Sequence, residues 1–192
     1  MKTYGLTGGI GMGKSTAAGL LRKRGIAVVD SDELAREVVE PGQPALAEIQ
    51  REFGGEMLDA DGRLRREELA GLVFASNEAR RKLEAILHPE IRAAREKLLL
   101  KWRKEGRTAA VAVIPLLFET GASDRFDETI CVACTPISQL QRLRARGWTD
   151  KQNGERLAAQ MPSEKKMLLS DYVVWTEGGL DVLEEQFRRV IP

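Results

Sequence analysis

The chain has 192 residues, 43% of them hydrophobic and 31% charged, with 30 basic and 29 acidic side chains and a net charge of +1. These values are typical of one globular domain with a small insert, and the near-zero charge argues against a protein that binds DNA or RNA. No apolar run approaches the ~20 residues that span a bilayer, so we expect no membrane association. The first residues lead directly into a folded motif, which leaves no room for a signal peptide and predicts a cytoplasmic protein.

Short apolar runs that predict strands alternate with patterns that predict helices. The predicted strands are residues 4–7, 26–29, 109–117, 129–133 and 172–175. Alternation of this kind predicts an α/β fold with three layers, in which a mostly parallel central sheet lies between helices on its two faces.

Two helical regions interrupt the alternation. Residues 42–106 contain no convincing strand pattern and several helical segments, the longest at about 77–104, and we interpret them as a helical insert. Residues 135–170 are rich in charges and are interpreted as a helical lid. The core of the fold then comprises residues 1–41, 107–134 and 171–192, the last of which ends in a helix at 180–190.

The sequence predicts where two helices of the lid begin. Thr135 followed by Pro136 predicts an N-cap with proline at the first helical position. Thr149 with Gln152 three residues later predicts a capping box.

The segment from Gly8 to Ser15 fits the phosphate-binding pattern G-x-x-x-x-G-K-S/T at every fixed position, between a predicted strand and a predicted helix. Its glycines let backbone N–H groups surround phosphate oxygens, and the helix N-terminus adds partial positive charge. Lys14 places a compact charge near the β- and γ-phosphates, and the Ser15 hydroxyl can ligate Mg²⁺. The motif therefore predicts a phosphotransferase that uses ATP and Mg²⁺. The residues expected to contact the nucleotide are Gly9, Gly11, Met12, Gly13, Lys14, Ser15 and Thr16.

Two acidic residues, Asp30 and Asp32, follow the second predicted strand. Strand ends beside the phosphate loop face the phosphates in sheets of this kind, and carboxylates two residues apart on extended backbone point the same way. We assign Asp30, together with Ser15, to the metal, and Asp32 to accepting a proton from the attacking hydroxyl. The alternative is that Asp30 or Ser31 caps the helix that begins near Glu33.

The two cysteines, Cys131 and Cys134, have the spacing of a redox or zinc motif. Zinc needs about four ligands, and the chain has no second pair and a single histidine. We interpret both cysteines as small apolar residues of a buried strand.

Several segments together resemble one family, the dephospho-coenzyme A kinases, over nearly the whole chain. The matching segments are Leu6 to Thr16, Val29 to Asp32, Val38 to Gly42, Leu87 to Arg92, Pro115 to Glu119, Gln139 to Arg146 and Ala159 to Met161. The phosphate loop is common to many nucleotide-binding proteins, whereas the His-Pro and Pro-Leu-Leu-Phe-Glu segments are much more specific. The resemblance implies transfer of a phosphoryl group from ATP to the ribose 3′-hydroxyl of dephospho-CoA, with a helical insert that binds the substrate and a lid.

The resemblance also implies roles for particular residues. Arg146 is expected to reach the transferring phosphoryl group and act as a catalytic residue with Lys14 and Asp32, and Arg142, four residues earlier on one helix face, is expected to bind ATP. Either arginine could instead belong to an ordinary solvated helix face. The resemblance places three further residues, with Asp32, beside the substrate, namely His88, Arg92 and Leu117. The proline after His88 biases that residue away from helix, and a single histidine is often structural.

The sequence departs from the family pattern at several positions. Met12 replaces a usual serine, and Val113 replaces an acidic residue that would serve the magnesium site or the substrate. Gly147 replaces an aspartate, and Trp175-Thr176 replaces the usual Asp-Asn after the last strand. A tryptophan there could stack on the adenine or pack in the core, and we favour the core.

Three functions are consistent with the sequence. The first is an active dephospho-CoA kinase, acting as a monomer or a small homo-oligomer. The second is another small-molecule P-loop kinase, against which the order of the motifs argues. The third is a weakened paralogue that binds nucleotide or CoA without turnover, which Val113, Gly147 and Trp175 favour.

Overall fold

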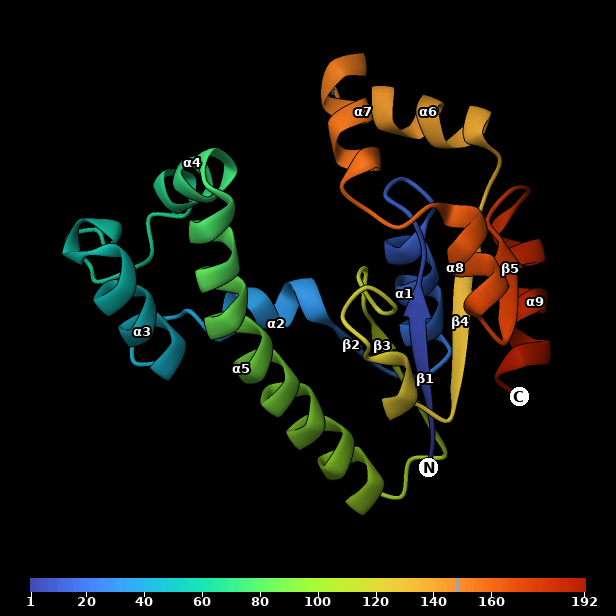
Figure 1. Cartoon of the computed structure of the whole chain (residues 1–192). Coiled ribbons are helices and arrows are strands. Elements are labelled where there is room, and N and C mark those ends of the chain that lie inside the picture. The colour runs from blue at the N-terminus through green and yellow to red at the C-terminus, as the bar shows by residue number, and fades with distance from the viewer. Residues whose placement is uncertain (148) are drawn as a thin grey trace. The chain divides into compact units, whose positions relative to one another are not determined.

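The computed structural model describes residues 1–147 and 149–192 (Figure 1). It divides into two compact units, one made of Met1–Asp30 with Trp102–Pro192 and one made of Ser31–Lys101. Residues 31–41, which the sequence places with the core, belong to the second unit. No helix of the described residues is both long and apolar enough to cross a membrane.

The first unit is built on a sheet of parallel strands in the order β2-β3-β1-β4-β5. The strands are β1 (Lys2–Thr7), β2 (Ala27–Asp30), β3 (Ala109–Val113), β4 (Glu128–Ala133) and β5 (Tyr172–Trp175). This arrangement confirms the predicted α/β fold with its parallel sheet. The third strand ends at Val113 rather than at 117, because Pro115 has no N–H with which to continue the ladder.

Alternate residues of β1 face opposite sides of the sheet. On one side, Leu6 lies in an apolar core with α1 (Lys14–Lys23) and α9 (Leu180–Val190), and this core includes Leu21 and Phe187, which are fully buried. On the other side, a Cβ at Gly5 would meet Phe126 and Leu117. Because successive residues of β1 point to opposite faces, apolar groups cover both faces of the sheet at this strand.

The lid region contains α6 (Pro136–Arg144), α7 (Asp150–Ala158) and α8 (Ser163–Leu169). Both predicted helix starts are confirmed: the Thr135 hydroxyl accepts from the N–H of Ser138 at 3.3 Å, and Thr149 forms a capping box with Gln152. Glu177, just after β5, accepts from the N–H of Thr135 at 3.0 Å. The first helix of the lid is thereby fastened to the end of the sheet.

Strand β5 lies at the edge of the sheet, and its exposed main chain is partly covered by a side chain of α9. The Trp175 N–H donates to Oε1 of Gln186 at 2.9 Å, and Nε2 of Gln186 donates back to the Trp175 carbonyl at 2.9 Å. The indole of Trp175 is 43% exposed, while Val174 takes the inward position. The expectation that Trp175 packs in the core is therefore wrong.

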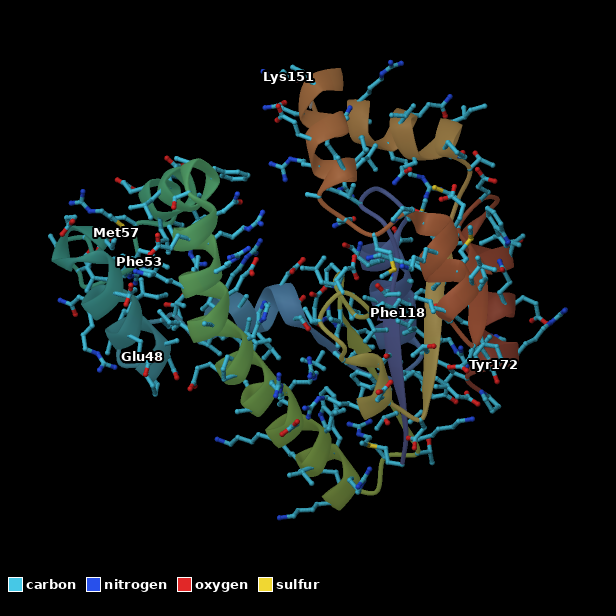
Figure 2. The ribbon with its side chains drawn as sticks, in the orientation of Figure 1. Glu48, Phe53, Met57, Phe118, Lys151 and Tyr172 are labelled. Atoms are coloured by element: carbon cyan, nitrogen blue, oxygen red, sulfur yellow. The ribbon has the colours of Figure 1, made fainter. Side chains whose placement is uncertain are left out.

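The second unit is helical and has its own apolar core. Its elements are α2 (Ser31–Glu37), α3 (Pro44–Phe53), the 3-10 turn η1 (Gly55–Met57), α4 (Arg66–Ala75) and most of α5 (Asn77–Lys104). Phe53 and Met57, labelled in Figure 2, pack in this core with Ile49 and Leu69.

Helix α5 continues through His88 and Pro89, so the expectation that this proline biases His88 away from helix is wrong. A proline inside a helix removes the hydrogen bond of its own nitrogen, and its ring crowds the carbonyl four residues earlier, so a continuous helix needs compensating contacts. The apolar residues on both sides, Leu87 and Ile91, pack against the helical core and keep the helix continuous.

Candidate active site

The phosphate loop turns between β1 and α1, and its lysine folds back over it. Lys14 is the first residue of α1, and its Nζ donates to the carbonyl oxygens of Gly8 at 2.8 Å and Gly9 at 3.1 Å. The ammonium group therefore lies across the mouth of the loop. Since the loop ends at a helix N-terminus, this corner combines a fixed cation with the positive end of a helix dipole.

Gly13 closes the loop in a conformation that favours glycine, with φ of 93°. A Cβ at this position would lie 3.0 Å from the methyl carbon of Thr176, which follows β5. The loop and the end of the sheet therefore approach each other too closely for a larger residue at position 13.

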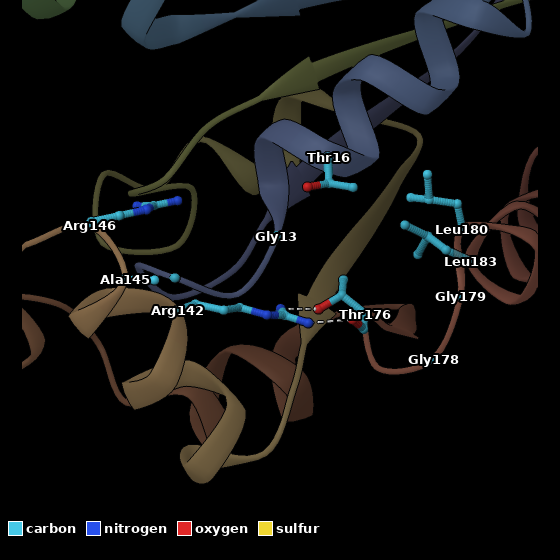
Figure 3. Close-up of a pocket in the computed structure, with 11 residues that line it drawn as sticks. Gly13, Thr16, Arg142, Ala145, Arg146, Thr176, Gly178, Gly179, Leu180 and Leu183 are labelled. Carbon is cyan, nitrogen blue, oxygen red and sulfur yellow. Dashed lines mark hydrogen bonds between the residues drawn. The ribbon is translucent and has the colours of Figure 1, made fainter.

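A cavity of ≈ 430 Å³ opens beside the loop (Figure 3). Its lining residues are Gly11, Gly13, Thr16, Arg142, Ala145, Arg146, Thr176, Gly178, Gly179, Leu180 and Leu183. The two arginines give one wall of the cavity positive charge, and the two leucines of α9 give another wall apolar surface. A cavity with these walls, next to a phosphate loop, suits the base and sugar of a nucleotide.

Arg142 extends from α6 to Thr176, as the dashed lines of Figure 3 show. Its Nη1 donates to the threonine hydroxyl at 2.7 Å and its Nη2 donates to the threonine carbonyl at 2.5 Å. The hydroxyl of Thr176 lies 3.0 Å from the carbonyl oxygen of Met12, to which it donates. One threonine thus links the lid arginine to the phosphate loop.

Arg146 also lines the cavity. The sequence predicts that it shares one helix face with Arg142, and this prediction is wrong. Helix α6 ends at Arg144, and the N–H of Arg146 donates to the carbonyl of Leu143 at 3.1 Å in a tighter turn. Gly147 follows with φ of 80°, a left-handed conformation that the aspartate usual in the family would adopt only with strain.

The tip of the phosphate loop is held by two glutamines that the sequence reading missed as site residues. Nε2 of Gln139, on α6, donates to the Ile10 carbonyl at 2.7 Å, and the Ile10 N–H donates to Oε1 of Gln160 at 3.0 Å. Both glutamines lie in segments that match the family, which was the one signal available. The two side chains fix both polar groups of Ile10.

The acidic residue expected from the family at position 113 is absent, and valine fills its place in the core. Val113 is 1% exposed and packs in the cluster that contains Leu6. In the sheet register its partners are Leu6 on β1 and Asp30 on β2. Asp30, half-buried at the end of β2, is thus a carboxylate that lies beside Val113 in the sheet.

The remaining predicted substrate residues are distributed over both units. Asp32 is exposed in the first turn of α2, and His88 and Arg92 are exposed on α5, all within the helical unit. Leu117, in the core unit, is fully buried against Gly5, which accounts for this leucine without a substrate. Roles for these four residues at the substrate stay predictions.

Met12 and the two cysteines have structural explanations. Met12 is 3% exposed and packs against Ala133, Cys134 and Met167, so its side chain fills an apolar space beneath the loop. Cys131 is buried on β4, as the sequence predicts, and burial raises the pKa of its thiol to about 11 despite nearby lysines.

These features define the class. A parallel sheet in the order β2-β3-β1-β4-β5, a phosphate loop after its central strand and arginines from a helical lid are the parts of a P-loop kinase.

Comparison with known proteins identifies the family within that class. A family model described as dephospho-CoA kinase matches residues 3–181. The dephospho-CoA kinase of Bdellovibrio bacteriovorus is 46% identical and covers 100% of this chain and 95% of its own length. That of Anaeromyxobacter dehalogenans is 44% identical, with 100% and 91% covered. The chain belongs to the dephospho-CoA kinase family.

Solved structures agree with this assignment. The protein TT1252 from Thermus thermophilus is 37% identical with a TM-score of 0.84, over 99% of this chain and 96% of its own. Dephospho-CoA kinase from Campylobacter jejuni is 25% identical with a TM-score of 0.74, over 100% and 96%. A shikimate kinase from Acinetobacter baumannii, at 14% identity with a TM-score of 0.53 over 100% and 93%, shares the fold alone.

Proposed function

We propose that this kinase transfers the γ-phosphoryl group of ATP to the ribose 3′-hydroxyl of dephospho-CoA, giving CoA and ADP. The observation that carries the proposal is the full-length match to dephospho-CoA kinases combined with an intact phosphate loop whose lysine is already in place. The near-zero net charge fits an enzyme of small molecules better than a protein bound to a polyanion.

The residues have distinct roles in this proposal. Lys14 binds the β- and γ-phosphates and exchanges its contacts with the loop carbonyls for phosphate oxygens. Arg146 neutralises charge that develops on the transferring group, while Arg142 holds the nucleotide at the cavity wall. Asp32 accepts the proton of the 3′-hydroxyl as that oxygen attacks in line, and the ADP oxygen leaves.

The residues present fit a magnesium ion that is bound mainly by phosphates. Mg²⁺ prefers oxygen ligands and keeps several waters, with one or two protein groups. The Ser15 hydroxyl is exposed in the first turn of α1, and Asp30 is a carboxylate at the same edge of the sheet. Among the described residues no three His, Cys, Asp or Glu side chains gather to hold a metal on their own. Mg²⁺, when bound, would neutralise phosphate charge.

The test is ADP release from ATP and Mg²⁺, with and without dephospho-CoA, in the wild type and in Asp32→Asn. We expect ADP release that depends on dephospho-CoA, CoA as the product and a loss of about 10²- to 10⁴-fold in kcat for the variant. Asp61→Asn, an exposed aspartate of the same unit, is the matched control and should keep wild-type activity.

Two results would count against the proposal. Turnover of shikimate or a nucleoside in place of dephospho-CoA would identify another kinase. Binding of dephospho-CoA in calorimetry without turnover would identify a weakened paralogue, and Val113→Asp would then be the next variant to assay.

A further inference from the structure

The core unit buries a lysine that the proposed mechanism does not use. Lys166, on α8, has no solvent exposure, and its Nζ lies 2.8 Å from Oε1 of Glu119. The same Nζ donates to the Pro115 carbonyl at 2.6 Å. A buried charge is costly unless it is paired and hydrogen-bonded, so this site is specifically built for a cation. Neither Lys166 nor Glu119 lines the nucleotide cavity.

The first link from this pair leads to the base of the phosphate loop. The Pro115 carbonyl that accepts from Lys166 also accepts from the hydroxyl of Thr7, at 3.2 Å. Thr7 is the last residue of β1 and directly precedes Gly8, the first residue of the loop.

The second link leads to the tip of the loop. Oε1 of Glu119 accepts from the N–H of Met161 at 3.0 Å, and the preceding residue, Gln160, accepts from the N–H of Ile10. Burial raises the pKa of Glu119, but the hydrogen bonds from Lys166 and Met161 outweigh it and leave the pKa below its usual value. Glu119 is therefore ionised at neutral pH and holds the Gln160–Met161 segment by a charge-assisted bond.

We propose that the buried Lys166–Glu119 pair positions the phosphate loop, by holding Gln160 where it fixes the Ile10 peptide at the loop tip. Both are positioning residues, since neither contacts the cavity. A loop held in one conformation presents its backbone N–H groups to phosphate without a cost of ordering. The inference rests on the proposed nucleotide role of the loop.

The experiment measures binding of the non-hydrolysable ATP analogue AMP-PNP with Mg²⁺ by calorimetry, without dephospho-CoA. The variants are Gln160→Met, the double variant Lys166→Met/Glu119→Met, which removes the acceptor for Met161, and the triple variant that combines them. The double variant removes both charges together, so that neither partner is left as an isolated buried ion. Urea unfolding determines the folded fraction of each protein.

We expect Gln160→Met and the double variant each to raise the Kd about three- to tenfold, the effect of losing one hydrogen bond. The triple variant should bind no more weakly than the weaker of the two, because both changes act through the same contact at Ile10. A second double variant, Lys166→Met/Glu119→Gln, keeps an acceptor for the Met161 N–H without leaving a buried charge, and it should weaken binding less. Arg188→Met breaks an exposed ion pair on α9, in which Arg188 lies 2.7 Å from Glu184. This control variant should leave the Kd unchanged.

Two results would overturn the inference. One is a folded Lys166→Met/Glu119→Met variant that binds AMP-PNP with the wild-type Kd. The other is a triple variant whose loss of affinity equals the product of the two separate losses. A wild-type protein that binds AMP-PNP but makes no CoA would contradict the proposed function, and it would leave the positioning role of Lys166 and Glu119 unaffected.

Discussion

Thr176→Val offers a direct test of how the lid arginine is held. Valine has nearly the shape of threonine, so the close approach to Gly13 is kept while the hydroxyl is lost. That hydroxyl accepts from Arg142 at 2.7 Å and lies within 3.0 Å of the Met12 carbonyl. The substitution removes both bonds without opening a cavity.

The expected magnitude follows from these two bonds. A hydrogen bond from a charged donor contributes ~1.5 kcal/mol at the low end of its range. We use this low value for Arg142 because its second hydrogen bond, to the Thr176 carbonyl, is kept in the variant. The bond to Met12 contributes ~1 kcal/mol. The free energy of unfolding should fall by about 2.5 kcal/mol, which lowers Tm by roughly 5–10 °C in a chain of this size. With one of its two tethers lost, Arg142 should also bind nucleotide roughly three- to tenfold more weakly.

Thermal unfolding and titration with a fluorescent ATP analogue measure the two effects. Thr176→Ser keeps the hydroxyl and should retain most of the nucleotide affinity. Thr120→Val removes an exposed hydroxyl that donates to the Leu116 carbonyl at 2.8 Å, and it controls for the substitution itself. A Thr176→Val protein with wild-type affinity for the analogue would refute the idea that Thr176 positions Arg142.

Three further predictions follow from single contacts. Lys14→Met should lower kcat/KM for ATP by about 10²- to 10³-fold in steady-state assays, because a cation at the phosphates is lost. Circular dichroism should show that the variant is still folded. A smaller loss would mean that Lys14 does not reach the phosphates. The Cys131 thiol, with its pKa raised to about 11 by burial, should not react with Ellman's reagent at about pH 8 until the chain unfolds, and fast labelling of folded protein would contradict this burial. Asp127 and Asp171 each accept from the N–H and hydroxyl of a threonine, and these bonds lower the pKa of both carboxyl groups below its usual value. Their stabilising effect is therefore present above the unfolded-state pKa and is lost as pH falls through the folded-state value. In urea titrations between about pH 5 and pH 3, Asp127→Asn and Asp171→Asn should lose less stability than the wild type, and equal losses would show that these carboxylates do not carry the effect.

Local patterns in the sequence were sufficient for much of the fold. The strands, the capping box at Thr149 and the long helix at 77–104 depend on spacing within a few residues, and the structure has each of them. The phosphate loop was equally legible, since its glycines and Lys14 act through the backbone next to them.

Contacts between distant parts of the chain could not be predicted in this way. Gln160 reaches Ile10 across 150 positions, and Thr176 reaches Met12 across 164. Glutamine and threonine are common surface residues, so nothing local marks these two as part of the site. The exposure of Trp175 was missed for a related reason, because a strand pattern does not tell an edge strand from a central one.

The departures from the family pattern differ in their expected effect on the candidate site. Met12 fills an apolar space, Gly147 suits a left-handed turn, and Thr176 holds Arg142, so three of the changes have compatible surroundings in this chain. Val113 is different, because the valine replaces a carboxylate that no other residue of β3 supplies. The parts proposed to bind nucleotide are thus intact, and the change bears on charge at the proposed metal and substrate sites. A weakened paralogue would therefore bind ATP normally and transfer its phosphoryl group slowly, and comparing Kd for AMP-PNP with kcat separates that outcome from a defect in binding.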